Sequence, residues 1–419
     1  MKLFTNNFIG NISATFIDQL SISFVQFFIG IIFIYKSVPE EYGLFSFLIA
    51  FYYLIASIQN ALISTPLMVL IPRLSIKEAG KLLRGFTGLL FTGIFILMIL
   101  TVLSLFLFSE HFERKSLHPL QVFCFLFGLS SLILRDFWRA AEFAQLRPMA
   151  ALKRDLIYTF FVIAMIIFMV SFAKIDSYNI FILIGVSALS VSILPSLNIC
   201  RPFPHMDEMY FAFRKSWKLS TWSVMGATSS WFQMQAVVYL PFFLIGLKEV
   251  AYLSAARLVM MPPALLQGSL GNYLRPLASR KLAEGDLPGT FRLYFICTFS
   301  LLVVLSLYTG VALLLLNQLP SSWIPDSYKN IGEYVILWAI IIFIMTIRST
   351  ISNLYHASLA FKQLAIRGTA SAIFTIIATW YFILKFDIDG TLVGRMAGEL
   401  FLMVLLAVNV HKIPKPRTG

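Results

Sequence analysis

Five charged residues interrupt long apolar stretches of the chain, and their chemistry needs an explanation first. Three are arginines, Arg257, Arg348 and Arg395, and two are acids, Asp18 and Glu399. A charge at the centre of a bilayer costs about 2.5–3.5 kcal/mol on insertion scales, so such residues mark binding sites or ion pairs. The arginines outnumber the acids by one, which favours an anionic ligand. We therefore treat the three arginines and Asp18 as candidate substrate-binding residues.

Each of these residues also has a structural interpretation. Arg395 and Glu399 are spaced i,i+4 on one helix face and can neutralise each other. Arg348 can extend toward the lipid headgroups at the nearer end of its helix. Arg257 has no partner along its own helix, and it could pair with Asp18 from another helix. The sequence leaves both kinds of interpretation open.

Prolines and amides add to the case for a polar site. Pro262 and Pro263 follow Arg257 and break a helix, which is tolerated mainly beside a cavity or a neighbouring helix. Gln59 and Gln267 join the candidate substrate-binding residues, although such amides also link helices. Polar side chains concentrate in the first two apolar stretches of each half of the chain, which predicts a shared, hydrated interior.

The composition shows what must position these residues. Of 419 residues, 59% are hydrophobic and 13% are charged, whereas a soluble domain carries roughly 25% charged residues. The expected fold class is an all-α integral membrane protein. A spanning helix needs about 20 apolar residues, which predicts about twelve transmembrane helices. The predicted spans are 13–35, 43–71, 86–108, 119–138, 152–173, 178–199, 221–245, 250–273, 291–316, 331–355, 366–385 and 389–409.

Basic residues orient the predicted spans. With the N-terminus inside, 23 lysines and arginines, Arg135 and Arg139 among them, fall in inside segments and 7 in outside segments. The positive-inside rule then predicts that both termini are cytoplasmic. These residues also account for the net charge of +13. Because they are spread over loops beside helix ends, membrane lipids are expected partners and nucleic acid is not.

The chain divides near its middle. We predict an N-terminal six-helix lobe over residues 1–205, a cytoplasmic connection over 206–220 and a C-terminal six-helix lobe over 221–419. A shift of 208 residues superimposes Glu41 on Glu249 and Gln59 on Gln267. Both copies begin outside and run inward, so the two lobes are expected to be related by a parallel repeat.

One motif resembles a known family. The segment Val38-Pro39-Glu40-Glu41-Tyr42-Gly43-Leu44-Phe45-Ser46 resembles the EYG-x-[FY]-S stretch of bacterial polysaccharide and O-antigen exporters. These are the lipid-linked oligosaccharide flippases of the multidrug/oligosaccharidyl-lipid/polysaccharide exporter superfamily. The second half departs from the motif, because it keeps Glu249 and Ser254 but has Ala251 in place of the glycine.

The resemblance implies a two-lobed carrier that works by alternating access in the bacterial cytoplasmic membrane. Its substrate would be an undecaprenyl-pyrophosphate-linked oligosaccharide for polysaccharide biosynthesis. Intramembrane arginines would bind the pyrophosphate or acidic sugars, a role that Arg257, Arg348 and Arg395 fit. Other polysaccharide assembly proteins would be partners.

Two other functions compete with this one. A cation-coupled exporter of drugs or metabolites would need a buried carboxylate cluster, for which the first half offers Asp18 alone. A membrane glycan polymerase or acyltransferase would need a long extramembrane loop or a His/Asp pair at its catalytic face. The outer loop over 109–119 is short and offers His111 and His118. Cysteines and histidines lack metal-ligand spacing and no phosphate-binding GxxxxGK[ST] loop occurs, so no cofactor, metal site or enzymatic activity is expected.

Overall fold

The computed structural model describes residues 2–71, 74–107, 119–172, 175–199, 204–267, 278, 281, 286–318, 325–328, 331–358 and 360–408. Over these ranges the chain is helical apart from short turns, and no strand occurs in them. The predicted all-α class is confirmed. The outer loop with His111 and His118 lies outside the described residues.

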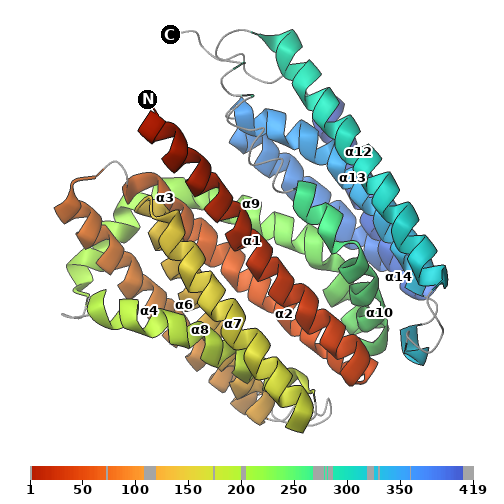
Figure 1. Cartoon of the computed structure of the whole chain (residues 1–419), viewed down its shortest axis with the longest axis horizontal. Helices are drawn as coiled ribbons and strands as arrows, with labels where there is room; N and C mark the ends of the chain where they lie inside the picture. The colour runs from red at the N-terminus through yellow and green to blue at the C-terminus, as the bar shows by residue number, and fades with distance from the viewer. Residues whose placement is uncertain are drawn as a thin grey trace. The chain divides into compact units, whose positions relative to one another are not determined.

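The helices follow the order of the predicted spans and are drawn in Figure 1. They are α1 (Lys2–Lys36), α2 (Pro39–Gln59), a π-helix η1 (Asn60–Ser64), α3 (Thr65–Leu70), α4 (Ile76–Leu107), α6 (Pro119–Ala144), α7 (Pro148–Phe172), α8 (Ser177–Ile199), α9 (Met206–Leu244), α10 (Leu247–Val259), α12 (Leu287–Gln318), a 3-10 turn η3 (Asp326–Tyr328), α13 (Ile331–Ala357) and α14 (Phe361–Val408).

Eight helices in the described part of the chain are long and apolar enough to cross a membrane. The predicted span 178–199 falls on α8, whose apolar stretch Ser177–Ile193 is shorter than the eight. The predicted spans 221–245 and 250–273 fall on α9 and α10, which are also not among them. Gln233 and Gln235 make α9 more polar, and α10 is only 13 residues long. These two helices also carry polar residues that the sequence assigned to a hydrated interior.

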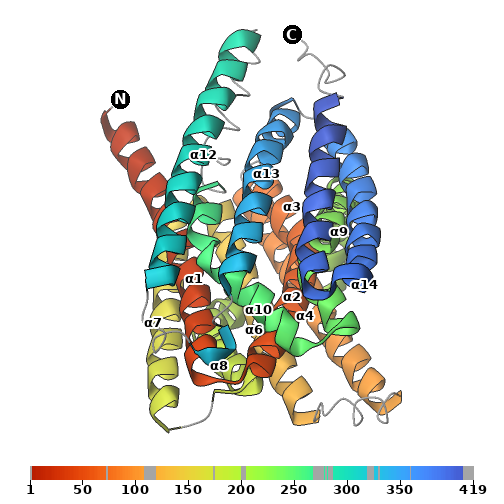
Figure 2. The same cartoon turned by 90° about the vertical axis from the view of Figure 1, so that its right-hand side faces the viewer.

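The last two predicted spans are the two arms of α14. The helix breaks at Phe386 (φ −132°, ψ 16°) and Asp387 (φ 47°, ψ −126°), where the sequence predicts a polar turn. Figure 2 shows the two arms side by side. A Cβ atom on Gly394 would lie 2.3 Å from the Cα atom of Thr379, so the arms pack at backbone distance. Small residues permit such an approach between membrane helices.

The chain forms two compact units. Residues 1–32 and 51–224 make unit 1, and residues 33–50 and 225–419 make unit 2. The predicted lobe boundaries stay a prediction. The segment 206–220, predicted as a connection, is helical, because it forms the first half of the continuous helix α9.

Glycines set the packing of unit 1. A Cβ atom on Gly128 in α6 would lie 2.6 Å from the carbonyl oxygen of Phe181 in α8, and one on Gly185 would lie 2.6 Å from the ring of Phe127. Helices α6, α7 and α8 therefore lie side by side, as Figure 1 shows. Charged side chains of α6 and α7 meet within this group of helices.

In unit 2 the motif glycine has a structural role. A Cβ atom on Gly43 would lie only 1.9 Å from the carbonyl oxygen of Leu247 at the start of α10. Phe47 stacks on Phe242 nearby, with ring centroids 3.8 Å apart. Under the 208-residue shift, position 247 corresponds to position 39, so the starts of the two repeat copies meet at this contact. Gly43 is needed because any side chain there would overlap the backbone of α10.

Gly394→Leu should destabilise the α14 hairpin, because the added side chain overlaps the backbone at Thr379. Overpacking of this kind costs about 1–3 kcal/mol, or more where the backbone cannot move. The measurement is thermal unfolding of the purified full-length protein in detergent. Gly368→Ala on the same helix is the control, because nothing lies within 4 Å of the added methyl group. Equal unfolding temperatures for the two variants would contradict the packing argument.

Candidate functional site

Glu399 is the centre of a buried charge cluster in unit 2. Its side chain is 1% exposed and forms ion pairs with two arginines, one at each carboxylate oxygen. Arg395 Nη2 lies 2.6 Å from Oε1, which confirms the pairing expected from their i,i+4 spacing. Arg348 Nε lies 2.5 Å from Oε2. The interpretation that Arg348 reaches for headgroups is therefore wrong, because its charge is held by Glu399 across the α13–α14 contact.

Arg395 is engaged through both of its terminal nitrogens, while its Nε has no hydrogen-bond partner among the described residues. It is 2% exposed, and its Nη1 donates a hydrogen bond to the backbone carbonyl of Gln233 in α9. One guanidinium thus joins α9 to the carboxylate of α14. Because both terminal nitrogens contact groups inside the protein, Arg395 holds the cluster together.

Arg257 is held differently. Helix α10 ends at Val259, and Met260 is non-helical (φ −89°, ψ 7°) just before the two prolines, as the sequence predicts. The guanidinium lies 5.8 Å from the ring centroid of Trp338, whose indole donates to the carbonyl of Leu253 at 3.0 Å. No carboxylate among the described residues forms an ion pair with Arg257. Its side chain is half-buried, and its guanidinium N–H groups are available to bind a ligand.

The cluster has an excess of positive charge. The charges of Arg348 and Arg257 both act on Arg395, so the three arginines share one electrostatic environment with a single glutamate. The excess is two positive charges over the described residues of the cluster. A guanidinium binds phosphate or carboxylate oxygens through two parallel hydrogen bonds. The arrangement suits an anionic group with several acceptor oxygens.

The two candidate glutamines differ in their partners. Gln267 Nε2 donates to Ser349 Oγ at 2.9 Å, so it binds to α13, the helix that carries Arg348. Gln59 lies in unit 1 and donates to Ser64 Oγ at 3.1 Å, across the π-helix η1. Short π-helices in otherwise α-helical segments are frequent at functional sites. Each side-chain amide is thus hydrogen-bonded to a serine: Gln59 to Ser64 and Gln267 to Ser349 of α13.

Asp18 belongs to a second charge cluster, which lies in unit 1. It is 0% exposed and accepts Arg139 Nε at 3.0 Å. The alternative that Asp18 neutralises Arg257 is therefore wrong, because its carboxylate is already paired. The second oxygen of Asp18, Oδ1, accepts no hydrogen bond from the described residues.

Four further charged members of this cluster, two acids and two arginines, were missed by the sequence interpretation. Asp155 in α7 is 0% exposed and lies 2.7 Å from Arg135 Nη2 and 3.0 Å from Arg139 Nε. Asp136 lies 3.6 Å from Arg135 Nη1 and accepts the hydroxyl of Tyr52. Asp18 and Glu399 are thus not the only acids in apolar helices. Three carboxylates face two arginines here, so this cluster has an excess of one negative charge.

A signal for these residues was present in the sequence. Arg135 and Arg139 are spaced i,i+4, and they were counted with the inside loops because basic residues are common there. Helix α6 continues to Ala144, past the predicted end at 138, so both arginines lie within it. Reading the helix face would have found the charged stripe, but its partner Asp155 is on another helix and only the fold brings it there.

Comparisons with known proteins address the fold. No protein-family model matches the sequence, and no curated protein is significantly similar to it. The structure is similar to the lipid II flippase MurJ in an inward closed conformation, with a TM-score of 0.65 and 17% identity over 99% of this chain and 88% of that chain.

Multidrug transporters are equally similar in structure. An inward-facing multidrug resistance MATE family transporter of the MOP superfamily has a TM-score of 0.66 and 12% identity over 96% of this chain and 95% of that chain. A variant of the Vibrio cholerae MATE transporter VcmN has a TM-score of 0.65 and 14% identity, with 97% and 96% covered. The chain therefore has the fold of MOP-superfamily transporters, a multi-pass membrane fold of about twelve transmembrane helices in two lobes.

Proposed function

We propose that this chain is a flippase that moves an undecaprenyl-pyrophosphate-linked oligosaccharide across the bacterial cytoplasmic membrane by alternating access. The observation that carries the proposal is the excess of two positive charges around Glu399 in unit 2. A lipid-linked glycan brings a pyrophosphate, whose charge would balance this excess. The shared fold with a lipid II flippase supports the same class of substrate.

The residues of the cluster have different tasks in this proposal. Arg257 binds the pyrophosphate, because its guanidinium lies beside Trp338 and has no carboxylate partner among the described residues. Arg348 adds its two terminal nitrogens, since Glu399 contacts its Nε. Arg395 raises the local positive potential while it donates a hydrogen bond to Gln233 and forms an ion pair with Glu399. Gln267 orients this part of the site through Ser349.

The physical sequence of events follows from charge. An anionic headgroup enters a cluster whose cations are already held in place, so little reorganisation is needed when it binds. The lipid tail stays in the bilayer, where it has no reason to leave hydrocarbon. Cytoplasmic termini and an inner-membrane location complete the proposal, with other polysaccharide assembly proteins as partners.

Arg257→Ala should lower the rate of glycolipid movement at least ten-fold, because it removes the cation with free donors. The measurement is the sidedness of a labelled lipid-pyrophosphate glycan in proteoliposomes. Arg257→Lys should recover part of the rate, since it keeps the charge without the two-pronged geometry. Lys248→Ala is the matched control, an exposed cation of the same helix α10.

Glycan movement that is unaffected by Arg257→Ala would keep the function and remove Arg257 from the site. An absence of movement in the folded wild-type protein, under any imposed ion gradient, would contradict the flippase.

A cation-coupled exporter is the second candidate, and the unit 1 cluster is the observation that favours it. Such an exporter needs a buried carboxylate that binds and releases a cation. Asp18, Asp136 and Asp155 exceed their arginine partners by one charge, and Asp18 Oδ1 is free of hydrogen bonds from the described residues. The fold shared with multidrug transporters fits this candidate equally well.

Asp18→Asn should abolish transport that depends on a proton or sodium gradient if this cluster couples the two movements. The measurement is uptake of a cationic dye, and separately of the glycolipid, into proteoliposomes with an imposed gradient. Asp207→Asn, an exposed acid of the same unit, is the control. Gradient-driven dye uptake without glycolipid movement would select the exporter over the flippase. Transport that is insensitive to Asp18→Asn would exclude this carboxylate from coupling.

A further inference from the structure

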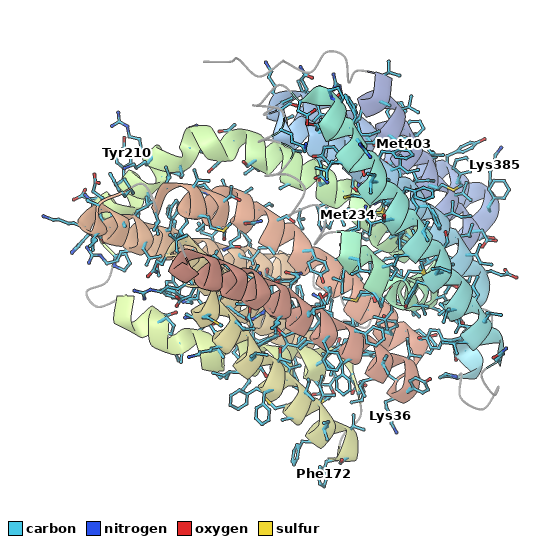
Figure 3. The ribbon with its side chains drawn as sticks, turned by 45° about the horizontal axis from the view of Figure 1, so that its top comes forward. Lys36, Phe172, Tyr210, Met234, Lys385 and Met403 are labelled. Carbon is cyan, nitrogen blue, oxygen red and sulfur yellow. The ribbon has the colours of Figure 1, made fainter. Side chains whose placement is uncertain are left out.

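The first turns of α9 carry an apolar stripe that faces away from the protein. Met206, Tyr210, Phe213 and Trp217 are spaced 4, 3 and 4 residues apart, and 45–77% of each is exposed. This spacing places them on one side of the helix. Figure 3 shows the Tyr210 side chain projecting outward from the ribbon. The stripe lies ahead of the predicted span 221–245, where a helix would reach the surface of the bilayer.

The opposite face of the same turns packs on α4. Ala212 and Ser216 are 0% and 3% exposed, and a Cβ atom on Gly85 would lie 2.2 Å from the carbonyl oxygen of Glu208. Arg84 Nη2 lies 2.6 Å from Glu208 Oε1 and fixes the register of the two helices. The apolar stripe is therefore presented outward by a rigid contact between α9 and α4.

Basic side chains border the stripe. Lys81 and Lys215 lie 5.1 and 5.0 Å from the centroid of the same Phe211 ring, and Arg214 is exposed beside them. The only acid of this contact within an ion pair is Glu208, which Arg84 neutralises. None of these three cations forms an ion pair with a described acid. At about 100° per residue, Arg214 lies next to the stripe, and Lys215 lies farther round the helix beside Phe211. Asp207 is an exposed acid of the same turns, so three cations stand against one exposed acid on this part of the surface.

We propose that this surface, formed by α9 residues 206–217 and Lys81 of α4, is a binding site for anionic phospholipid at the membrane interface. Tyr and Trp favour the headgroup level, where an apolar ring and a polar edge are both accommodated. Lysines and arginines near an anionic leaflet attract its headgroups. An amphipathic helix with aromatic residues on one face and cations beside them binds such a surface.

The charge pattern favours a lipid over a protein partner. A protein-binding patch usually loses charged residues at its centre and gains aromatic ones, whereas here the exposed Arg214 lies next to the aromatic stripe on the helix surface. The stripe also continues directly into the predicted span 221–245 of the same helix. The site is separate from the arginine cluster, so it does not depend on the proposed substrate.

The test uses the full-length protein in nanodiscs that contain lipids with brominated chains, which quench nearby tryptophan fluorescence. The Trp217 signal is the difference between the wild type and Trp217→Phe. Brominated phosphatidylglycerol and brominated phosphatidylcholine are compared at equal mole fraction. Each cation near the surface is expected to enrich the anionic lipid up to about five-fold, so phosphatidylglycerol should quench Trp217 more strongly.

The double variant Arg214→Ser, Lys215→Ser should remove most of this preference, while Lys153→Ser, an exposed lysine of the same unit, should leave it unchanged. Equal quenching by both lipids in the wild type would overturn the anionic site. Quenching by neither would overturn the lipid contact altogether and leave the stripe to a protein partner or water. The wild-type comparison needs no variant to fold.

Discussion

A charged side chain inside an apolar helix must be compensated within the protein, because hydrocarbon supplies neither hydrogen bonds nor counter-ions. This constraint organises both units. Asp155 in unit 1 holds two arginines of α6, and Glu399 in unit 2 holds one arginine of α13 and one of α14. Each acid is almost completely buried, so the helices that carry its partners cannot separate without exposing a charge to lipid. Removing one member of such a pair costs about 3–5 kcal/mol.

Close helix contacts make this compensation possible. A guanidinium reaches a carboxylate on another helix only when the two helices pack closely, and glycines permit close packing at Gly128 between α6 and α8 and at Gly394 between the two arms of α14. Arg395 and Glu399 lie one and five residues after Gly394, on the arm of α14 that packs against Thr379. The helices α6 and α14, which carry the charge clusters, are therefore also packed through glycines. The motif glycine, Gly43, makes a similar close contact with the backbone of Leu247 at the start of α10.

The two clusters are not balanced, and the imbalance has opposite sign in the two units. Unit 1 has one more carboxylate than arginine, whereas unit 2 has two more arginines than carboxylates. An excess charge in an apolar surrounding is stabilised by a mobile partner, such as a proton, a metal cation or an anionic substrate. This difference is the physical basis for assigning a coupling cation to unit 1 and an anionic headgroup to unit 2 within the proposed functions.

Composition and hydropathy alone determined the all-α membrane class and the order of the spans, because a run of about 20 apolar residues needs a helix in lipid whatever its neighbours are. The turn at Asp387 and the pairing of Arg395 with Glu399 were also predictable, since both are local in sequence. The partners of Arg348, Asp18 and Arg135 were decided only by the tertiary structure. Their carboxylates and guanidinium groups come from different helices, and sequence spacing carries no information on which helix faces lie in contact.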